Sequence, residues 1–546
     1  MPASKMARWS AMVVGVVALT TTTVACASSS EGTGGGSSEP VHGGELTYLV
    51  DQAQLTLDPG VSPAEVTGLI DRNIFDSLVV QAGPSTFQPW LATKWTISAD
   101  GLEYTFDLKP GVKFSDGTPF DAGAVKATLD HIVQPETKSQ YAASLIAPYK
   151  SSTVIDASTI KITLSKPFRP LLQALSTPFL GIQSSKALAV PATDYKPVGT
   201  GPYTFVSWTQ QKDVKLTRNP DYASPPSNAP HTGSAYLETL NFNYVAEDTT
   251  RYGALTSGQA QGIDGLPPIR VKTVQSNPKL EVLKGDIPGA DYSIFFNVKS
   301  PLTSDPLVRQ AFQAAIDMPA LVQSIYFGQY ATAKNVLAPS TADYDPEAEK
   351  SLQAYDLAKA RQLLDQAGWA STNADGYRTK DGKELKLVWP SFALLNRDQR
   401  DVLGQGIQAK AKEVGIRVER PNLDEGAYSD AVLNGGYDLL DVSNTRADPD
   451  ILRFTFASDA TFSKGGANIS LANSPELDGW INEGAATSDA AVAKSDYAKA
   501  QAYVLKNAYV LPAYVAPYLV GASAKLRGVT FDAQGFPQFY GAWMTR

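Results

Sequence analysis

The sequence predicts a mixed α/β protein that is divided into two or three domains. Its 546 residues are too many for a domain with a single hydrophobic core, because such cores stop growing beyond roughly 250 to 300 residues. Hydrophobic residues make up 43% of the chain and charged residues 19%, and this globular composition excludes a disordered or collagen-like body. Helical and strand-like patterns alternate in the second half, which favours an α/β domain with a partly parallel sheet.

The N-terminus has the pattern of a secretory signal. Lys5 and Arg8 precede a short apolar run, and small residues then lead to Cys26. This order is typical of a signal peptide over residues 1–25, and the run is shorter than the roughly 20 apolar residues of a transmembrane helix. The ending resembles the lipobox of bacterial lipoproteins, so we expect Cys26 to be lipidated and residues 26–43, rich in Gly and Ser, to form a tether. Ordinary cleavage with an unmodified cysteine is the alternative.

The first half of the body predicts a strand, a hairpin and a helix. Residues 45–50 alternate polar and apolar side chains and predict an opening strand. The Asp-Gly pair at 100–101 predicts a β-hairpin, because its turn needs a positive φ. Asp121 precedes apolar residues at helical spacing and is expected to cap a helix over 122–132. Strand signals return over 152–164.

The second half predicts helices that begin at aspartates. Asp305 followed by Pro306 is a strong helix start, since proline lacks only a donor that would be unpaired there. Asp356 begins a second helix, which is expected to end at Gly368. The other predicted elements are strands over 291–298, 416–420 and 512–522, and helices over 396–415 and 490–507. A terminal strand that returns after a long helix suggests lobes joined by more than one segment.

Composition and motifs exclude several kinds of chemistry. The formal net charge is −8, so no nucleic-acid partner is expected, because such proteins carry a basic excess. The chain has one cysteine and three scattered histidines, which excludes a disulfide framework and weakens the case for a metal site. It contains no nucleophile elbow, zincin or phosphate-loop motif. We therefore expect no cofactor, no metal and no catalytic residues, and a protein that is not an enzyme.

Five blocks of sequence stand out when they are taken in order. They are Leu91 to Phe120, Gly199 to Tyr203, Val308 to Asp317, Tyr355 to Gly368, and Asp448-Pro449. Together they resemble the extracellular solute-binding proteins of the peptide/nickel class of ABC importers, solute-binding protein family 5, and the resemblance covers essentially the whole body from Gly43.

The resemblance implies a bilobed, periplasmic-binding-protein-like α/β fold of type II, in its large three-subdomain variant. Lobe I would be discontinuous, with residues 44–288 and 512–546 and a subdomain at about 80–190. Lobe II would span residues 289–511. Such a body works as a clamp, because a solute that contacts both lobes favours the closed state.

The resemblance also implies a receptor that delivers a small organic solute to an ABC permease and its ATPase. We expect a monomeric lipoprotein on the outer face of the cell membrane, with an oligopeptide as the favoured solute. An oligosaccharide or an opine-like solute is the alternative within this class. A cell-surface hydrolase or a secreted folding helper is the alternative from another class.

Candidate solute contacts follow from the same resemblance. They are Gln52, Gln54, Trp389, Phe392, Tyr428, Asn444, Thr445, Arg446 and Asp448. The three aromatic residues could stack on solute rings, although core packing is the more frequent role of such side chains. The glutamines, which follow the first strand, could equally lie in an exposed loop.

The segment around Asp448-Pro449 carries the sharpest expectation. Peptide-binding relatives use an aspartate three positions before this pair to hold the α-amine, and here that position is Thr445. Either Asp448 or Asp450 substitutes for it, or the solute is not an ordinary peptide. Arg446 could hold a solute carboxylate as a bidentate clamp, or it could form a structural salt bridge with Asp448 or Asp450.

Overall fold

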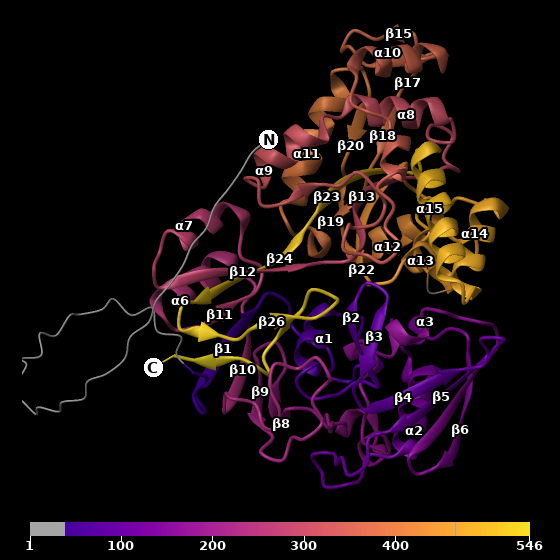
Figure 1. Ribbon diagram of the computed structural model, residues 1–546. Helices are drawn as coiled ribbons and strands as arrows, with labels where there is room; N and C mark the ends of the chain where they lie inside the picture. Colours follow the sequence, from indigo (N-terminus) through magenta and orange to yellow (C-terminus); the bar gives the residue numbers. More distant parts are fainter. Residues whose placement is uncertain (1–38, 465, 546) are drawn as a thin grey trace, which may run out of the picture. The chain divides into compact units, whose positions relative to one another are not determined.

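Two large β-sheets, one mixed and one antiparallel, organise the body of the protein, and the chain crosses between them twice (Figure 1). The computed structural model describes residues 39–545 apart from residue 465. The predicted signal peptide, Cys26 and most of the predicted tether lie outside the described residues. The residues from Pro40 onward form one compact unit.

The larger sheet has seven strands in the order β12-β24-β11-β1-β10-β9-β8. β1 lies parallel to β10 and β11, whereas the other neighbours are antiparallel. Leu46, Tyr48 and Val50 of β1 are buried, so the predicted opening strand is confirmed at the centre of this sheet. The strands are β1 (Glu45–Val50), β8 (Tyr203–Thr209), β9 (Asp213–Arg218), β10 (Thr239–Tyr244), β11 (Gly262–Ile263), β12 (Leu280–Asp286) and β24 (Pro517–Ser523).

A four-stranded antiparallel sheet with α2 (Ala122–Val133) packed on it forms a separate layer. Its strands are β4 (Ala92–Ile97), β5 (Glu103–Leu108), β7 (Thr159–Leu164) and β6 (Tyr149–Asp156). The predicted hairpin and helix cap are confirmed: Gly101 has a φ of +68°, and the Asp121 carboxylate accepts from the Ala124 N–H at 2.9 Å. The strand signals over 152–164 belong to two strands, because the Asp156 carboxylate accepts from the Ser158 N–H and turns the chain.

The second large sheet has the order β14-β23-β13-β22. β13 (Gly289–Phe296) is buried along its whole length, and its neighbours are β14 (Ala331–Thr332), β22 (Leu439–Thr445) and β23 (Val510–Val515). The predicted caps Asp305 and Asp356 accept from the backbone at the start of α8 (Pro306–Ala315) and α10 (Leu357–Gln366). Other helices around it are α9 (Met318–Ile325), α11 (Arg400–Lys412), α12 (Glu425–Asn434), α13 (Ile451–Phe456), α14 (Pro475–Ala486) and α15 (Ala490–Lys506).

The helix predicted over 396–415 begins only at Arg400. Asp398 and Gln399 have φ values of +55° and +58°, a left-handed conformation that a right-handed helix cannot contain. Residues 396–399 therefore form an irregular turn ahead of α11.

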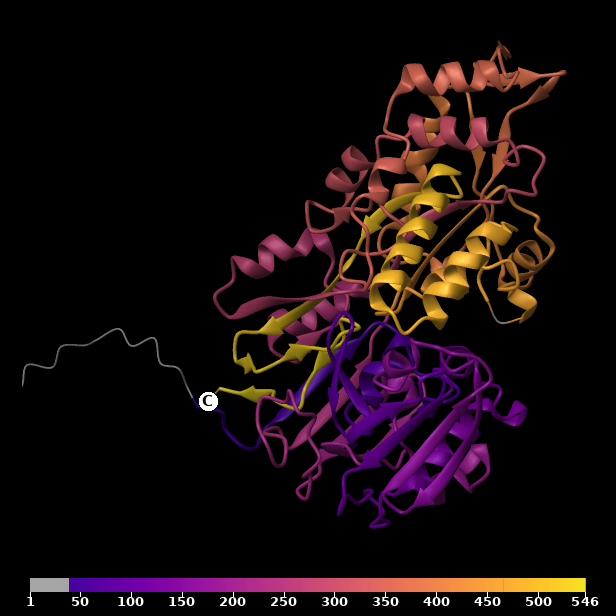
Figure 2. The same ribbon diagram turned by 45° about the vertical axis from the view of Figure 1, so that its right-hand side comes forward.

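Both crossings between the large sheets are short. The first runs from β12 to β13 through Ile287 and Pro288, and the second from β23 to β24 through Ala516. The predicted boundary at residue 512 falls inside β23, so we propose lobe boundaries at the crossings instead. Lobe I then contains the seven-stranded sheet, the β4–β7 layer and the C-terminal tail, and lobe II contains the sheet around β13 (Figure 2).

The remaining elements are short and complete the two lobes. In lobe I they are α1 (Glu65–Asp71), β2 (Val79–Gly83), β3 (Thr86–Pro89), α3 (Ala142–Leu145), α4 (Leu171–Ala174), α5 (Ser185–Leu188), α6 (Asp248–Ser257), α7 (Val271–Gln275), β25 (Leu526–Arg527), β26 (Thr530–Phe531), β27 (Pro537–Gln538) and β28 (Trp543–Met544). In lobe II they are β15 (Ser371–Thr372), β16 (Arg378–Lys380), β17 (Lys383–Glu384), β18 (Lys386–Val388), β19 (Ser391–Phe392), β20 (Arg417–Glu419) and β21 (Asn422–Leu423).

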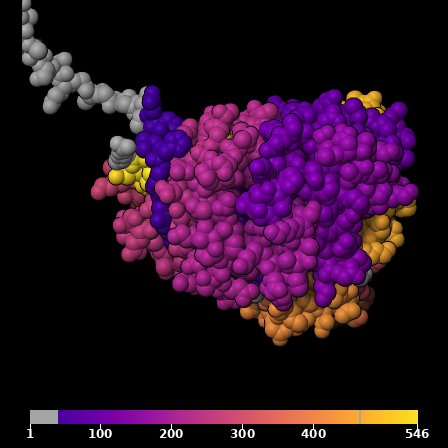
Figure 3. Space-filling view, turned by 90° about the horizontal axis from the view of Figure 1, so that it is seen from below, coloured from indigo at the N-terminus to yellow at the C-terminus, as the bar shows by residue number. Residues whose placement is uncertain are grey.

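Lobe I supplies most of the face that is seen from below, with lobe II visible at its edge (Figure 3). Among residues 39–545, residue 465 aside, no helix combines the length and the apolar character needed to cross a membrane.

Candidate functional site

Polar side chains from both lobes meet where β22 ends and α1 begins. Thr445, the last residue of β22, donates its hydroxyl to Glu65 Oε1 at 2.8 Å. Glu65 is the first residue of α1, and its Oε2 lies 3.6 Å from Arg397 Nη1. Nearby, the Tyr141 hydroxyl donates to the Thr445 carbonyl oxygen at 3.4 Å. One lobe I carboxylate therefore contacts two separate segments of lobe II.

The contact between Glu65 and Arg397 is loose and accessible. Their nitrogen and oxygen lie beyond hydrogen-bonding distance, and the side chains remain 35% and 40% exposed. The Glu65 carboxylate nevertheless raises the pKa of the Arg397 guanidinium. Both groups can therefore exchange part of this contact for a charged solute.

Arg397 is positioned by the irregular turn ahead of α11. Non-glycine residues with positive φ, such as Asp398 and Gln399, persist only where surrounding contacts hold them. Arg400 supplies such contacts: its Nε donates to the Tyr514 hydroxyl at 3.2 Å and its Nη2 to Ser443 Oγ at 3.0 Å. Its buried guanidinium thus ties the turn to β22 and β23.

Four tyrosine rings pack together next to this turn. Tyr326 and Tyr330 stack with centroids 4.4 Å apart, and Tyr292 and Tyr514 stack at 4.7 Å. The Tyr330 hydroxyl donates to Asp398 Oδ1 at 3.3 Å. Burial raises the pKa of all four phenols, so they act as neutral donors and packing surfaces.

Two aspartates of lobe I, Asp51 and Asp264, add acidic groups near this contact. Asp51 follows β1, and burial raises its pKa while Arg251 and Arg397 oppose that rise. Burial, and next the Asp51 charge, raise the pKa of Asp264. The Arg251 guanidinium donates hydrogen bonds to backbone carbonyl oxygens, including that of Val245 at 2.8 Å. Carboxyl groups of lobe I therefore lie close to the guanidinium of Arg397.

Four of the candidate residues lie in the segments that carry Asp51 and Thr445. Gln52 is half-buried and Gln54 is buried in the segment after β1. Asn444 and Thr445 end β22. Among the described residues, neither Gln54 Nε2 nor Asn444 Nδ2 has a hydrogen-bond partner.

Arg446 is part of lobe II and is only 3% exposed. Its Nε lies 3.7 Å from Asp448 Oδ1, and its Nη2 lies 3.7 Å from Asp450 Oδ2. Burial raises the pKa of Asp448 to about 6, against the opposing charge of Arg446. This geometry favours the structural salt bridge over the bidentate clamp.

The aromatic candidates divide into two kinds. Trp389 is fully buried and donates Nε1 to Asp441 Oδ1 at 2.6 Å, so it packs in the core of lobe II. Phe392 and Tyr428 are half-buried, and their rings stack at 5.7 Å. They remain proposed solute contacts.

The sequence did not indicate Glu65, Arg397 or Asp398 as site residues. Glu65 opens a short helix, and nothing near it in the sequence marks it as special. Residues 396–400 read Asn-Arg-Asp-Gln-Arg, a cluster of charge at a predicted helix start. In the sequence, this cluster was the one feature that could have pointed to Arg397 and Asp398 as site residues.

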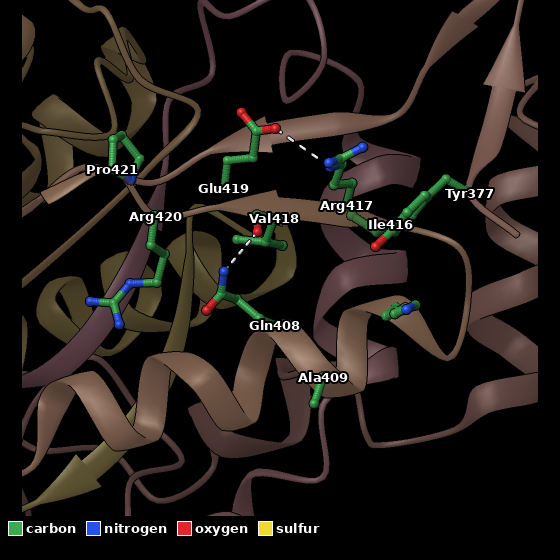
Figure 4. Close-up of a pocket in the computed structure, with 10 residues that line it drawn as sticks. Tyr377, Gln408, Ala409, Ile416, Arg417, Val418, Glu419, Arg420 and Pro421 are labelled. Atoms are coloured by element: carbon green, nitrogen blue, oxygen red, sulfur yellow. Dashed lines mark hydrogen bonds and ion pairs between the residues drawn. The ribbon is translucent and has the colours of Figure 1, made fainter. Parts of the chain in front are cut away.

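A hollow of about 630 Å³ lies on lobe II between α11 and β20 (Figure 4). Gln408 Nε2 donates to the Val418 carbonyl oxygen at 2.8 Å, and Arg417 Nε lies 3.4 Å from Glu419 Oε1. Every lining residue belongs to lobe II, so lobe closure cannot grip a solute there. We do not assign the solute to this hollow.

Within the described part of the chain, no three His, Cys, Asp or Glu side chains are grouped so that they could hold a metal ion. The candidate site therefore consists of carboxylates, guanidinium groups, amides and hydroxyls. These groups suit an organic solute with both charged and hydrogen-bonding atoms.

Known proteins resemble this chain over most of its length. The glutathione-binding protein GsiB of Escherichia coli is 30% identical over 388 residues, which cover 70% of each chain. The structure of DppA from Helicobacter pylori in complex with the peptide STSA has a TM-score of 0.76 at 26% identity, covering 93% of this chain and 99% of that one. AgaA from A. tumefaciens, in complex with agropinic acid, has a TM-score of 0.75 at 22% identity, with coverages of 92% and 99%.

The family described as bacterial extracellular solute-binding proteins, family 5, matches residues 86–464. The predicted family and the mixed α/β binding-protein fold are thereby confirmed. Members are extracytoplasmic transport receptors, so the expectation that the protein is not an enzyme is confirmed by its family. The chain belongs to family 5 of the bacterial extracellular solute-binding proteins, the receptors of peptide/nickel-class ABC importers.

Proposed function

We propose that this receptor captures a small peptide-like zwitterion between Glu65 of lobe I and Arg397 of lobe II. The observation that carries the proposal is the position of the Glu65 carboxylate, 2.8 Å from Thr445 Oγ1. Peptide-binding relatives hold the α-amine with an aspartate at the position where this chain has Thr445. Glu65 supplies that carboxylate from the opposite lobe.

The charge arrangement of the cleft fits a zwitterion. A solute ammonium would replace Arg397 beside Glu65, and a solute carboxylate would pair with the released guanidinium, which suits bidentate binding. Because these groups belong to different lobes, each end of the solute favours the closed state. Gln54 and Asn444 would donate to carbonyl oxygens between the two ends.

The relatives support this solute class. GsiB is named for glutathione, and DppA was solved with the peptide STSA. AgaA was solved with agropinic acid, which keeps an opine-like solute as the second candidate. Arg397 favours that candidate too, since it could hold an acidic solute without help from Glu65.

The proposal extends to the setting of the receptor. We infer a lipid on Cys26, a tether over residues 26–43, and delivery of the solute by the monomeric protein to an ABC permease and its ATPase. The sequence pattern and the family membership support these steps.

The solute class is tested by calorimetric titration with a short peptide and with its N-acetylated twin. Glu65→Gln should weaken binding of the free-amine peptide roughly tenfold to hundredfold, because it removes a charged hydrogen bond of about 1.5–3 kcal/mol. The same substitution should change the affinity for the N-acetylated peptide little, because that peptide has no free amine for Glu65 to bind. Glu103→Gln is the matched control, since Glu103 is an exposed acid paired with Lys161 in the β4–β7 layer.

An unchanged affinity in the Glu65→Gln variant would refute the role of Glu65. Binding of agropinic acid that depends on Arg397 and not on Glu65, with no peptide binding, would establish the opine-like alternative.

A further inference from the structure

The two lobes also touch away from the Glu65–Arg397 contact, at the end of α14. The Arg169 N–H of lobe I donates to the Ala485 carbonyl oxygen of lobe II at 2.8 Å. The Arg169 guanidinium extends this contact, because its Nη1 lies 3.0 Å from Asp343 Oδ2 of lobe II. Figures 1 and 2 show the end of α14 facing the β4–β7 layer of lobe I. One residue of lobe I therefore binds two segments of lobe II.

Ala485 fits this contact in two ways. It is 3% exposed and packs in a hydrophobic cluster whose other buried members all belong to lobe I. It also lies in the last turn of α14, where carbonyl oxygens have no partner within the helix. The Arg169 N–H satisfies one of these oxygens, and a cation is favourable at a helix C-terminus. Separation of the lobes would expose Ala485 and break its hydrogen bond.

Both partners of the ion pair are fixed by their own lobes. Phe168, next to Arg169, is buried, and its carbonyl oxygen accepts from the Tyr104 hydroxyl of β5 at 3.1 Å. Asp343 has a φ of +55°, and Gln501 Nε2 of α15 donates to its carbonyl oxygen at 2.9 Å. A non-glycine residue in this conformation costs free energy and persists only where neighbouring contacts hold it. A strained turn of lobe II thus places the Asp343 carboxylate against lobe I.

The contact belongs to one arrangement of the lobes. A hydrogen bond is lost when its heavy atoms move apart by about 0.7 Å, so a rotation that opens the lobes at this point breaks both bonds of Arg169. The side chains of Arg169 and Asp343 are 25% and 11% exposed, and water therefore screens their attraction less than that of a fully exposed pair. The contacts of Glu65 with Thr445 and Arg397 involve other residues of both lobes.

We propose that Arg169, Asp343 and Ala485 form a latch that favours the closed lobes whether or not a solute is bound. Because a solute that contacts both lobes binds the closed state best, a larger closed fraction raises its apparent affinity. Arg169 thereby sets how tightly each solute is bound without touching it. The latch goes beyond the proposed recognition of a zwitterion and does not depend on it.

The latch is tested on the full chain by measuring the distance between the lobes without any solute. Spin labels are attached to Lys150→Cys in lobe I and Ser488→Cys in lobe II, both at exposed positions. Cys26→Ser removes the only natural cysteine. Pulsed electron paramagnetic resonance gives the distribution of distances. Arg169→Ala should raise the ratio of long to short distances about threefold, as expected for the loss of a partly buried ion pair.

Arg527→Ala is the matched control. Arg527 Nη1 lies 3.0 Å from Glu281 Oε2, but both residues belong to lobe I, so its loss should leave the distances unchanged. Arg169→Lys keeps the charge and should restore most of the short distances. Asp343→Asn, which tolerates a positive φ, should act like Arg169→Ala and add little to it in the double variant.

Melting curves show that each variant is folded. Unchanged or shorter distances in the folded Arg169→Ala and Asp343→Asn variants would overturn the latch. Effects of the two substitutions that add fully in the double variant would overturn it too, because they would show that the two residues act independently.

A second arm titrates the unlabelled variants with trialanine and with N-acetyltrialanine. Arg169→Ala should weaken binding of either peptide by the same factor, about threefold, since it changes closure and not the contacts with solute. A loss confined to one peptide would show that Arg169 contacts the solute and would overturn the latch. The spin-label distances need no solute, and Glu65→Gln leaves Arg169 in place, so the latch and the proposed function fail separately.

Discussion

Single buried residues set how this protein responds to pH. Asp76 is fully buried and accepts hydrogen bonds from Thr200 Oγ1 at 3.0 Å, Ser224 Oγ at 2.8 Å and the Tyr222 hydroxyl at 3.2 Å. Burial raises its pKa from 3.8 to about 6, and these hydrogen bonds oppose the rise. The folded protein therefore holds the Asp76 proton more tightly than the unfolded chain does.

The sign of the resulting stability change follows from linkage. Because the folded pKa is the higher one, the contribution of Asp76 is fully present below pH 3.8 and is lost as the pH rises through about 6. A shift of this size corresponds to about 3 kcal/mol at most. Asp76→Asn should lower stability overall but flatten the change in melting temperature between pH 5 and pH 7. If the melting temperature changed with pH equally in the wild type and in Asp76→Asn, the role given to the Asp76 carboxyl group would be wrong.

Arg446 is the buried cation nearest to Asp448. Arg446→Ala leaves Asp448 buried without that counter-charge, whereas Asp450 keeps Arg453 at 3.0 Å, and breaking a buried pair typically costs about 3–5 kcal/mol. We expect a clear drop in melting temperature, with solute affinity changed little in the folded fraction. A weakened affinity at an unchanged melting temperature would show instead that Arg446 holds the solute.

At the scale of elements, the turn ahead of α11 is a strained segment at the solute site. Gln399→Gly should stabilise the protein by about 1 kcal/mol, because glycine adopts a positive φ without the cost of a side chain. Gln405→Gly is the matched control in the exposed interior of α11 and should destabilise by about 1 kcal/mol. Denaturant unfolding measures the free energy of unfolding of both variants. A destabilised Gln399→Gly variant would show that the positive φ of Gln399 is not a source of strain.

The elements that the sequence predicted best are those specified locally. Asp121, Asp305 and Asp356 cap helices as predicted, since a cap involves only neighbouring residues. The start of α11 was missed because its positive φ values depend on Arg400 contacting Tyr514, more than 100 residues away. The Glu65–Thr445 bond joins residues 380 positions apart. No pattern near either residue could reveal that contact.

For the whole molecule, the predicted lipid on Cys26 would hold the receptor at the membrane, whereas a protein without it would be freely secreted. Cys26→Ala should release the protein from the membrane fraction into the medium of the natural host, whereas Ser28→Ala should leave it bound. Immunoblots of the two fractions measure this. Retention of the Cys26→Ala variant in the membrane fraction would show that another feature anchors the protein.

If the two lobes close on a peptide-like zwitterion, native mass spectrometry of the protein purified from its host should find that solute bound. We expect one bound small molecule per chain that carries a free amine and a carboxylate, and we expect it to be lost in the Glu65→Gln variant. A bound sugar, or a bound molecule without an amine, would contradict it.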